Sequence, residues 1–110
     1  MFILFDIGGT NTRIALSEDL VSFKNVVKFK TPLHYEEGLN KIKDTVISIS
    51  NGVGVLGLAG GIRGPLNSEK TGIISEVVLT DWVGKNITED LSKIFNAPAY
   101  LENDTAIVGL

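Results

Sequence analysis

Short apolar runs separated by turn residues dominate the first third of the chain. Residues 2–5 are wholly apolar and end at Asp6, a pattern that predicts a strand buried on both faces. Two adjacent glycines then predict a tight turn, and residues 12–17 predict a second strand that pairs with the first as a hairpin. Residues 26–30 alternate apolar and basic side chains, which predicts a third, half-exposed strand.

Beyond residue 32 the apolar positions take the spacing of an amphipathic helix. They recur at intervals of three or four residues and form one stripe, made of Tyr35, Leu39, Ile42, Val46 and Ile49. Two glutamates lie near the start, where the helix dipole favours anions, and Asn51-Gly52 is expected to end the helix. Residues 53–59 predict a fourth strand, buried and parallel to the first, that ends in a loop over residues 60–65.

The segment between residues 73 and 98 carries mixed signals. Residues 73–74 and 77–79 predict a further strand or hairpin. Asn86 and Glu89 have the spacing of a capping box, and the apolar positions after them predict a short amphipathic helix. Residues 96–98, which end in proline, are expected to stop that helix.

A last strand is predicted at residues 99–101, and a helix is expected to begin at Thr105. The alternation of strands and helices indicates an α/β fold. About one and a half turns of helix from Thr105 onward would be too short to be stable unless packed, so a larger protein is expected to continue beyond residue 110.

Composition narrows the classes of protein to consider. The 110 residues are enough for one domain with a core, and 44% of them are hydrophobic and 21% charged. A formal net charge of −3 gives no electrostatic reason to expect binding to nucleic acid or to an anionic membrane. Because the chain has no cysteine, it contains no disulfide, thiolate metal site or cysteine nucleophile, and a cytoplasmic location fits. The longest apolar stretch, residues 53–62, is shorter than the roughly 20 residues that a membrane span needs.

The first candidate site is the turn that follows the first strand. Its glycines let the backbone approach a ligand, and successive backbone N–H groups in such a turn form a nest suited to phosphate. The turn comprises Gly8, Gly9, Thr10, Asn11 and Thr12. Asp6 precedes it at the strand end and is placed to hold Mg²⁺ through water. A plain hairpin turn explains a glycine pair alone, but the flanking aspartate and the Thr-Asn-Thr run favour a phosphate site.

The second candidate site follows the last strand. Glu102, Asn103 and Asp104 lie where the carboxyl end of a strand faces the ligand crevice of an open α/β sheet. A carboxylate there can accept the proton of an attacking hydroxyl, as phosphoryl transfer requires of a general base. Asn103 or Asp104 can equally cap a helix that starts at Thr105, and the two roles are compatible.

The third candidate site is the loop over residues 60–65. Gly60 and Gly61 allow backbone N–H groups to meet a ligand, and Arg63 can contact a hydroxyl or a phosphate. An ordinary turn at a strand end is the alternative. Two other residues invite functional interpretation: His34, the only histidine, is expected to have a surface role, and Trp82 to pack in the core.

These sites, in this order, resemble those of the ROK family of bacterial sugar kinases and its glucokinase relatives. Residues 6–16 (DIGGTNTRIAL) look like the family's first phosphate motif, and residues 57–65 (GLAGGIRGP) resemble its glycine-rich substrate loop. Residues 79–82 (LTDW) are similar to the stretch before the family's second helix, and residues 101–106 (LENDTA) resemble its Asn-Asp segment. The resemblance spans essentially the whole chain. Family sequences often have proline where Arg63 stands.

The resemblance implies the ribonuclease-H-like, actin-like ATPase fold, with a mixed five-stranded sheet and flanking helices. It implies that Asp104 is the catalytic base and that Asn103, Gly60, Gly61 and Arg63 contact the sugar. It also implies that residues 8–12 face the phosphates of ATP and that Asp6 organises Mg²⁺.

The implied function is that of an ATP-dependent sugar (hexose) kinase, a glucokinase-like transferase that moves the γ-phosphoryl of ATP to a sugar hydroxyl. Residues 1–110 would form its single N-terminal domain, and a C-terminal nucleotide and sugar domain would lie outside this chain. The chain alone is therefore expected to be inactive. Expected partners are a sugar, ATP and the missing domain, with no nucleic acid or membrane, and a homo-oligomer is left open.

Two alternatives stand beside this hypothesis. One is a non-catalytic sugar- or phosphate-sensing domain of the same fold. The other is an actin-fold kinase for a different acceptor, such as an acetylated amino sugar or a short acid.

Overall fold

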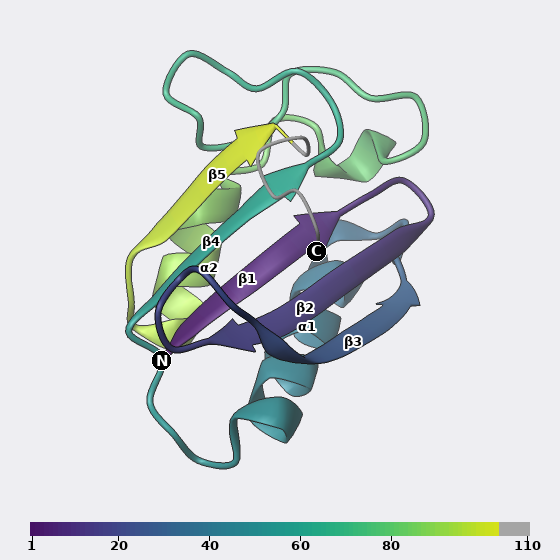
Figure 1. Ribbon diagram of the computed structural model, residues 1–110. Helices are drawn as coiled ribbons and strands as arrows, with labels where there is room; N and C mark the ends of the chain where they lie inside the picture. Colours follow the sequence, from purple (N-terminus) through teal and green to yellow (C-terminus); the bar gives the residue numbers. More distant parts are fainter. Residues whose placement is uncertain (104–110) are drawn as a thin grey trace.

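Residues 1–103 form a mixed five-stranded sheet with two α-helices and one short 3₁₀ helix (Figure 1). The computed structural model describes residues 1–103. The strands are β1 (Phe2–Ile7), β2 (Asn11–Ser17), β3 (Lys24–Lys30), β4 (Gly57–Ile62) and β5 (Ala99–Asn103). The helices are α1 (Tyr35–Ser50), α2 (Ile87–Phe95) and a short 3₁₀ helix, η1 (Thr80–Trp82).

The strands lie in the order β3-β2-β1-β4-β5. Strand β1 pairs antiparallel with β2 and parallel with β4, so it forms the centre of the sheet. Strand β2 pairs antiparallel with β3, and β4 pairs parallel with β5. Figure 1 shows α1 and α2 on the same face of the sheet. Along the chain, α1 connects the edge strand β3 to β4, and α2 lies between β4 and the other edge strand, β5. Right-handed strand–helix–strand connections place helices over a sheet in this way.

The main core lies between the sheet and these two helices. Alternate side chains of β1 point to the helices, and Ile3, Phe5 and Ile7 are each 0% exposed. The stripe predicted for α1 is buried at four of its five positions, since only Ile49 is partly exposed. Leu91 of α2 completes this interface at 0% exposure. The hydrophobic patterns of β1 and α1 are therefore explained by a shared core.

Helix α1 is capped by a residue that lies far away in the sequence. His34 occupies the N-cap position but its side chain accepts no capping hydrogen bond. Instead, the backbone N–H of Tyr35 donates to Oδ2 of Asp81, 2.8 Å away, in the 3₁₀ helix η1. A carboxylate at this end satisfies one of the otherwise unpaired N–H groups and complements the helix dipole. The predicted end of the helix is confirmed, because Asn51 adopts the left-handed conformation (φ 51°).

Trp82 anchors η1 against α1. It is 0% exposed, and its Nε1–H donates to the carbonyl oxygen of Pro32 over 3.0 Å. Its ring meets Tyr35 edge-on, with 5.2 Å between ring centroids, and lies directly over Gly38. A β-carbon at Gly38 would lie 2.3 Å from Cζ2 of Trp82, so only glycine admits the ring this close to the helix. The predicted packing role of Trp82 is confirmed.

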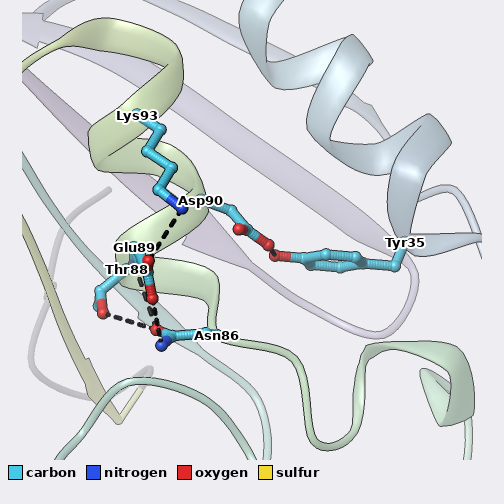
Figure 2. A network of polar contacts seen from close by, with 6 residues as sticks. All are labelled: Tyr35, Asn86, Thr88, Glu89, Asp90 and Lys93. Atoms are coloured by element: carbon cyan, nitrogen blue, oxygen red, sulfur yellow. Dashed lines mark hydrogen bonds and ion pairs between the residues drawn. The ribbon is translucent and has the colours of Figure 1, made fainter.

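A polar contact links the two helices (Figure 2). The hydroxyl of Tyr35 donates to Oδ2 of Asp90 in α2 over 2.6 Å. Burial of the phenol raises the pKa of Tyr35, and the hydrogen bond to the Asp90 carboxylate raises it further. The phenol is therefore a neutral donor throughout the ordinary pH range.

The start of α2 confirms the predicted capping residue (Figure 2). Oδ1 of Asn86 accepts the backbone N–H of Glu89 at 3.3 Å, and Nδ2 of Asn86 donates to Oε2 of Glu89 at 2.8 Å. Lys93 pairs with Glu89 one turn later, at 2.9 Å. The helix ends at Asn96 in the left-handed conformation (φ 51°), as the sequence predicts.

Two predicted elements are wrong in extent or kind. The fourth strand begins at Gly57, not at residue 53, because Val53 and Leu56 are exposed and pairing with β1 starts at Gly57. Residues 73–79 form no strand; Ile73 makes one isolated bridge, and the segment is a loop anchored by buried side chains such as Leu79. Within residues 1–103, no helix has the length and apolar character to cross a membrane.

Candidate functional site

Three segments from distant parts of the sequence meet at one edge of the sheet. Strands β1, β4 and β5 are parallel, so their carboxyl ends reach the same edge, as their arrowheads show in Figure 1. In register, Asp6 lies beside Gly61, and Gly61 lies beside Glu102. One position further, Ile62 lies beside Asn103. This is the edge at which open α/β sheets bind ligands.

The turn between β1 and β2 is closed by its own backbone. The N–H of Gly8 donates to the carbonyl oxygen of Asn11 over 2.9 Å, and a β-carbon at Gly8 would lie 2.9 Å from that oxygen. Close approach is therefore the reason for glycine at position 8; neither Gly8 nor Gly9 has a positive φ. Thr10 and Asn11 are exposed at the tip of the turn.

Thr12 and Thr31 support this turn from beneath. Thr31 Oγ1 donates to the carbonyl oxygen of Gly8 over 2.8 Å. Since that hydroxyl has a single proton, the 2.8 Å contact between the two threonine hydroxyls must have Thr12 as its donor. Thr12 is 1% exposed, so its hydroxyl supports the turn rather than lying at its surface. Thr31 was not predicted as a site residue; its position before Pro32, just after β3, was the only signal in the sequence.

The second glycine pair lies in a strand, not in the predicted loop. Gly60 and Gly61 belong to β4 and pair with β1 on one side and β5 on the other. A β-carbon at Gly60 would lie 2.2 Å from the carbonyl oxygen of Phe5 and 2.3 Å from Cδ2 of the Phe5 ring. Gly60 therefore permits Phe5 to pack tightly against the sheet, and the loop itself begins at Arg63.

Arg63 connects the loop to the turn. Its backbone N–H donates to the carbonyl oxygen of Ile7 over 2.9 Å and continues the pairing of β4 with β1. A β-carbon at Gly9 would lie 3.7 Å from Arg63 Cδ and 3.8 Å from Arg63 Nη1, so the side chain runs alongside the turn. Nε of Arg63 lies 3.3 Å from Oε2 of Glu76. The predicted first and third sites are thus neighbours.

The end of β5 carries the remaining predicted residues. Asn103 is the last residue of β5 and is exposed. Glu102 is held by Lys70, whose Nζ lies 2.9 Å from one carboxylate oxygen and 3.1 Å from the other. Asp104, the predicted base, and the helix expected at Thr105 lie outside the described residues.

The donor atoms at this edge suit Mg²⁺ better than a metal held by protein alone. Among residues 1–103, no group of three or more histidine, aspartate or glutamate side chains is placed to hold a metal ion. Asp6 is half-buried at the end of β1, next to the turn. Mg²⁺ commonly takes one or two carboxylates, with water and substrate phosphates as its other ligands. The site therefore fits a Mg²⁺ ion that arrives with a phosphate ligand. His34 is exposed and belongs to no such group.

The comparisons with known proteins agree with the resemblance drawn from the motifs. The sequence model of the ROK family matches residues 3–109. A ROK family glucokinase from Streptomyces griseus, solved with glucose and AMPPNP, superposes with a TM-score of 0.81 at 22% identity, over 93% of this chain and 32% of its own. A ROK family protein from Streptococcus pneumoniae, solved with sucrose, has a TM-score of 0.77 at 27% identity, over 99% of this chain and 37% of its own. A ROK family transcriptional regulator, a homologue of the E. coli MLC protein, has a TM-score of 0.74 at 19% identity, over 94% of this chain and 28% of its own.

No curated protein matches the sequence. The chain spans about a third of the length of the solved structures that it matches. The fold is the ribonuclease-H-like, actin-like ATPase fold of these proteins, as predicted.

Proposed function

This chain belongs to the ROK family, and we propose that it is the N-terminal half of an ATP-dependent sugar kinase. The observation that carries the proposal is the meeting of three segments at the carboxyl edge of the sheet. The turn after β1 lies beside Arg63, which follows β4, and β4 pairs with the strand that ends at Asn103. A phosphate donor and a sugar acceptor need adjacent sites, and this edge offers both.

The donor side is the turn between β1 and β2. Gly9, Thr10 and Asn11 would direct backbone and side-chain donors at the phosphates of ATP. Gly8 and Thr12 would contribute indirectly, because the N–H of Gly8 and the hydroxyl of Thr12 already hold the turn in shape. The Streptomyces glucokinase, which shares this fold, was solved with the ATP analogue AMPPNP.

Asp6 would hold Mg²⁺ through water. When bound, Mg²⁺ neutralises charge on the phosphate oxygens. Asp6 is fixed at the end of β1, one residue before the last residue of that strand, so its carboxylate would keep a constant position relative to the turn.

The acceptor side is the end of β5 and the residues that follow it. Asn103 would hold the sugar, Gly60 and Gly61 would shape the wall beside it, and Asp104 would act as general base. In the transfer step, the sugar hydroxyl gives its proton to the Asp104 carboxylate, and its oxygen bonds to the γ-phosphorus of ATP. The bond from that phosphorus to the β,γ-bridging oxygen breaks, and ADP leaves with the electron pair.

The rest of the catalytic cleft would come from a C-terminal domain. Residues 1–110 would form one domain, and the partner domain would complete the nucleotide and sugar sites. The complete protein would work in the cytoplasm, where ATP is supplied, while this chain alone would be inactive. The length of the ROK structures, about three times the matched segment, supports this division.

The test is turnover by the complete protein that contains this chain, with Mg²⁺, ATP and a panel of hexoses. Replacement of Asp104 by Asn is expected to lower kcat by about 10²–10⁴-fold, the usual contribution of a general base. Asp44→Asn, an exposed carboxylate of α1, is the matched control and should leave kcat unchanged. Near-normal turnover by Asp104→Asn would refute the assignment of Asp104 as the general base.

The second candidate is a non-catalytic sugar- or phosphate-sensing domain. The likeness to a ROK family transcriptional regulator supports this second candidate, because that protein shares the fold. Calorimetry of the complete protein separates the two functions. Hexose binding with neither nucleotide binding nor turnover would support the sensor.

A further inference from the structure

The side chain of Arg63 is held beside the turn between β1 and β2. A β-carbon at Gly9 would lie 3.7 Å from Arg63 Cδ and 3.8 Å from Arg63 Nη1. The backbone of Arg63 is fixed by the 2.9 Å hydrogen bond to the carbonyl oxygen of Ile7. The guanidinium therefore lies next to the turn that would bind phosphate.

A buried carboxylate holds one side of this guanidinium. The side chain of Glu76 is only 5% exposed, whereas that of Arg63 is 56% exposed. Oε1 of Glu76 accepts the backbone N–H of Val77 at 2.7 Å, and Oε2 lies 3.3 Å from Nε of Arg63. No hydrogen bond to Oε2 is made within the described part of the chain. Because an isolated buried carboxylate is costly, this ion pair with Nε is its main compensation and keeps the arginine in place.

The loop that carries Glu76 is itself fixed over the turn. Gly64 has a φ of +113°, and a β-carbon there would lie 2.9 Å from the carbonyl oxygen of Ser75. The N–H of Ile74 donates to the carbonyl oxygen of Pro65 over 3.0 Å. Val78 reaches the turn as well, with its Cβ 3.7 Å from a β-carbon at Gly9. Arg63 and Val78 thus reach the turn from two ends of one closed loop, and Glu76 contacts Arg63 from within that loop.

The arrangement leaves the outer nitrogens of Arg63 for another anion. The contact between Glu76 and the guanidinium is through Nε, at 3.3 Å, and 56% of the Arg63 side chain is exposed, so an anion in solution can reach it. A guanidinium presents a planar fork that matches phosphate oxygens, whereas a neutral sugar hydroxyl needs no charge. In phosphoryl transfer, charge is spread over the equatorial oxygens of the transferred group, and an arginine there raises the rate.

We propose that Arg63 contacts the γ-phosphoryl group of the nucleotide during transfer and that Glu76 is its positioning residue. This inference rests on the proposed kinase function and deepens it. It assigns Arg63 to the phosphate that moves and not to the sugar that receives it.

The first experiment separates the two assignments kinetically, in the complete protein. Arg63→Gln is expected to lower kcat by about 10³-fold while the KM for the sugar changes by less than about threefold, because the lost contact is to the transferred phosphate and not to the sugar. Lys43→Gln, an exposed cation of α1, is the matched control and should change neither constant. A raised KM for the sugar with an unchanged kcat would overturn the proposal in favour of a sugar contact.

The second experiment does not depend on turnover. Calorimetry with Mg²⁺-AMPPNP and Mg²⁺-ADP should show that Arg63→Gln weakens AMPPNP binding by about 10- to 100-fold, the range of a hydrogen bond to a charged group, and ADP binding far less. Equal weakening of both nucleotides, or of neither, would overturn the proposal. An absence of nucleotide binding by the wild-type protein would overturn it together with the kinase function. Selective loss of AMPPNP binding in a protein without turnover would support the arginine contact while refuting the kinase function.

Glu76→Gln tests the positioning role. It should lower kcat by about tenfold and reduce the preference for AMPPNP over ADP, with the KM for the sugar unchanged. A lowered melting temperature with the nucleotide preference intact would assign Glu76 to structure alone.

Discussion

Gly38→Ala is expected to destabilise the chain, although alanine is the better helix former. In the interior of a helix, alanine is favoured over glycine by about 1 kcal/mol. At this position, however, the new β-carbon would lie 2.3 Å from Cζ2 and 2.6 Å from Cη2 of Trp82. Such overlap must be relieved by a movement of the indole ring or of α1.

The ring has little freedom to move. Trp82 is 0% exposed, its Nε1–H is hydrogen-bonded to the carbonyl oxygen of Pro32, and its edge contacts Tyr35. Overpacking a close-packed core costs about 1–3 kcal/mol, and this fixed ring argues for the upper end of that range. After the gain of about 1 kcal/mol from helix propensity, the free energy of unfolding should fall by about 2 kcal/mol.

Urea unfolding followed by tryptophan fluorescence and circular dichroism measures the change. The midpoint should shift to lower urea, and the melting temperature should fall by roughly 8–16 °C for a domain of this size. Gly54→Ala is the matched control, because no atom lies within 4 Å of its β-carbon position, and it should be neutral or stabilising by up to about 1 kcal/mol. If Gly38→Ala raised the stability as Gly54→Ala does, the close packing of Trp82 on α1 would be refuted.

Two further predictions concern how α1 is held. Asp81→Ala removes the carboxylate that accepts the N–H of Tyr35 and should lower the free energy of unfolding by about 0.5–2 kcal/mol in a urea titration, whereas Asp44→Ala, in the exposed middle of α1, should change it little. Tyr35→Phe removes the hydrogen bond to Asp90. Because the pKa of Tyr35 is raised in the folded state, the neutral phenol contributes to the free energy of unfolding in full below the unfolded pKa of about 10, and this contribution is lost as the pH rises above that value. Wild-type unfolding measured from pH 8 to 11 should therefore lose stability above about pH 10 more steeply than Tyr35→Phe does, and parallel curves for the two proteins would contradict the assignment.

Much of the fold could be predicted because its signals are local. The stripe of α1, the capping pair Asn86–Glu89 and the alternation in β3 each depend on residues within a few positions of one another. The start of β4 could not be predicted in this way, because pairing with β1 and not apolarity decides where the strand begins. Residues 73–79 misled the sequence prediction, since apolar residues there anchor a loop to the core instead of extending a sheet.

For the candidate site as well, the features that depend on neighbouring residues could be predicted and the contacts between distant residues could not. Its position at a strand edge could be predicted from Asp6, the glycine turn and Asn103, because each follows an apolar run. The support of the turn by Thr31, 23 residues from Gly8, is a contact across the sheet that no local pattern encodes. The role of Gly60 depends on the distance to Phe5 in a neighbouring strand, and the role of Glu76 depends on how a loop folds back onto Arg63.

The most direct test of the proposed cleft is a crystal structure of the complete protein with glucose and AMPPNP. The account predicts the γ-phosphate within about 3 Å of a backbone N–H in the turn between β1 and β2. It also predicts one sugar hydroxyl within about 3 Å of the Asp104 carboxylate, in line with that phosphate. Phosphates bound away from residues 8–12, or a sugar whose reacting hydroxyl is held by a different base, would contradict it.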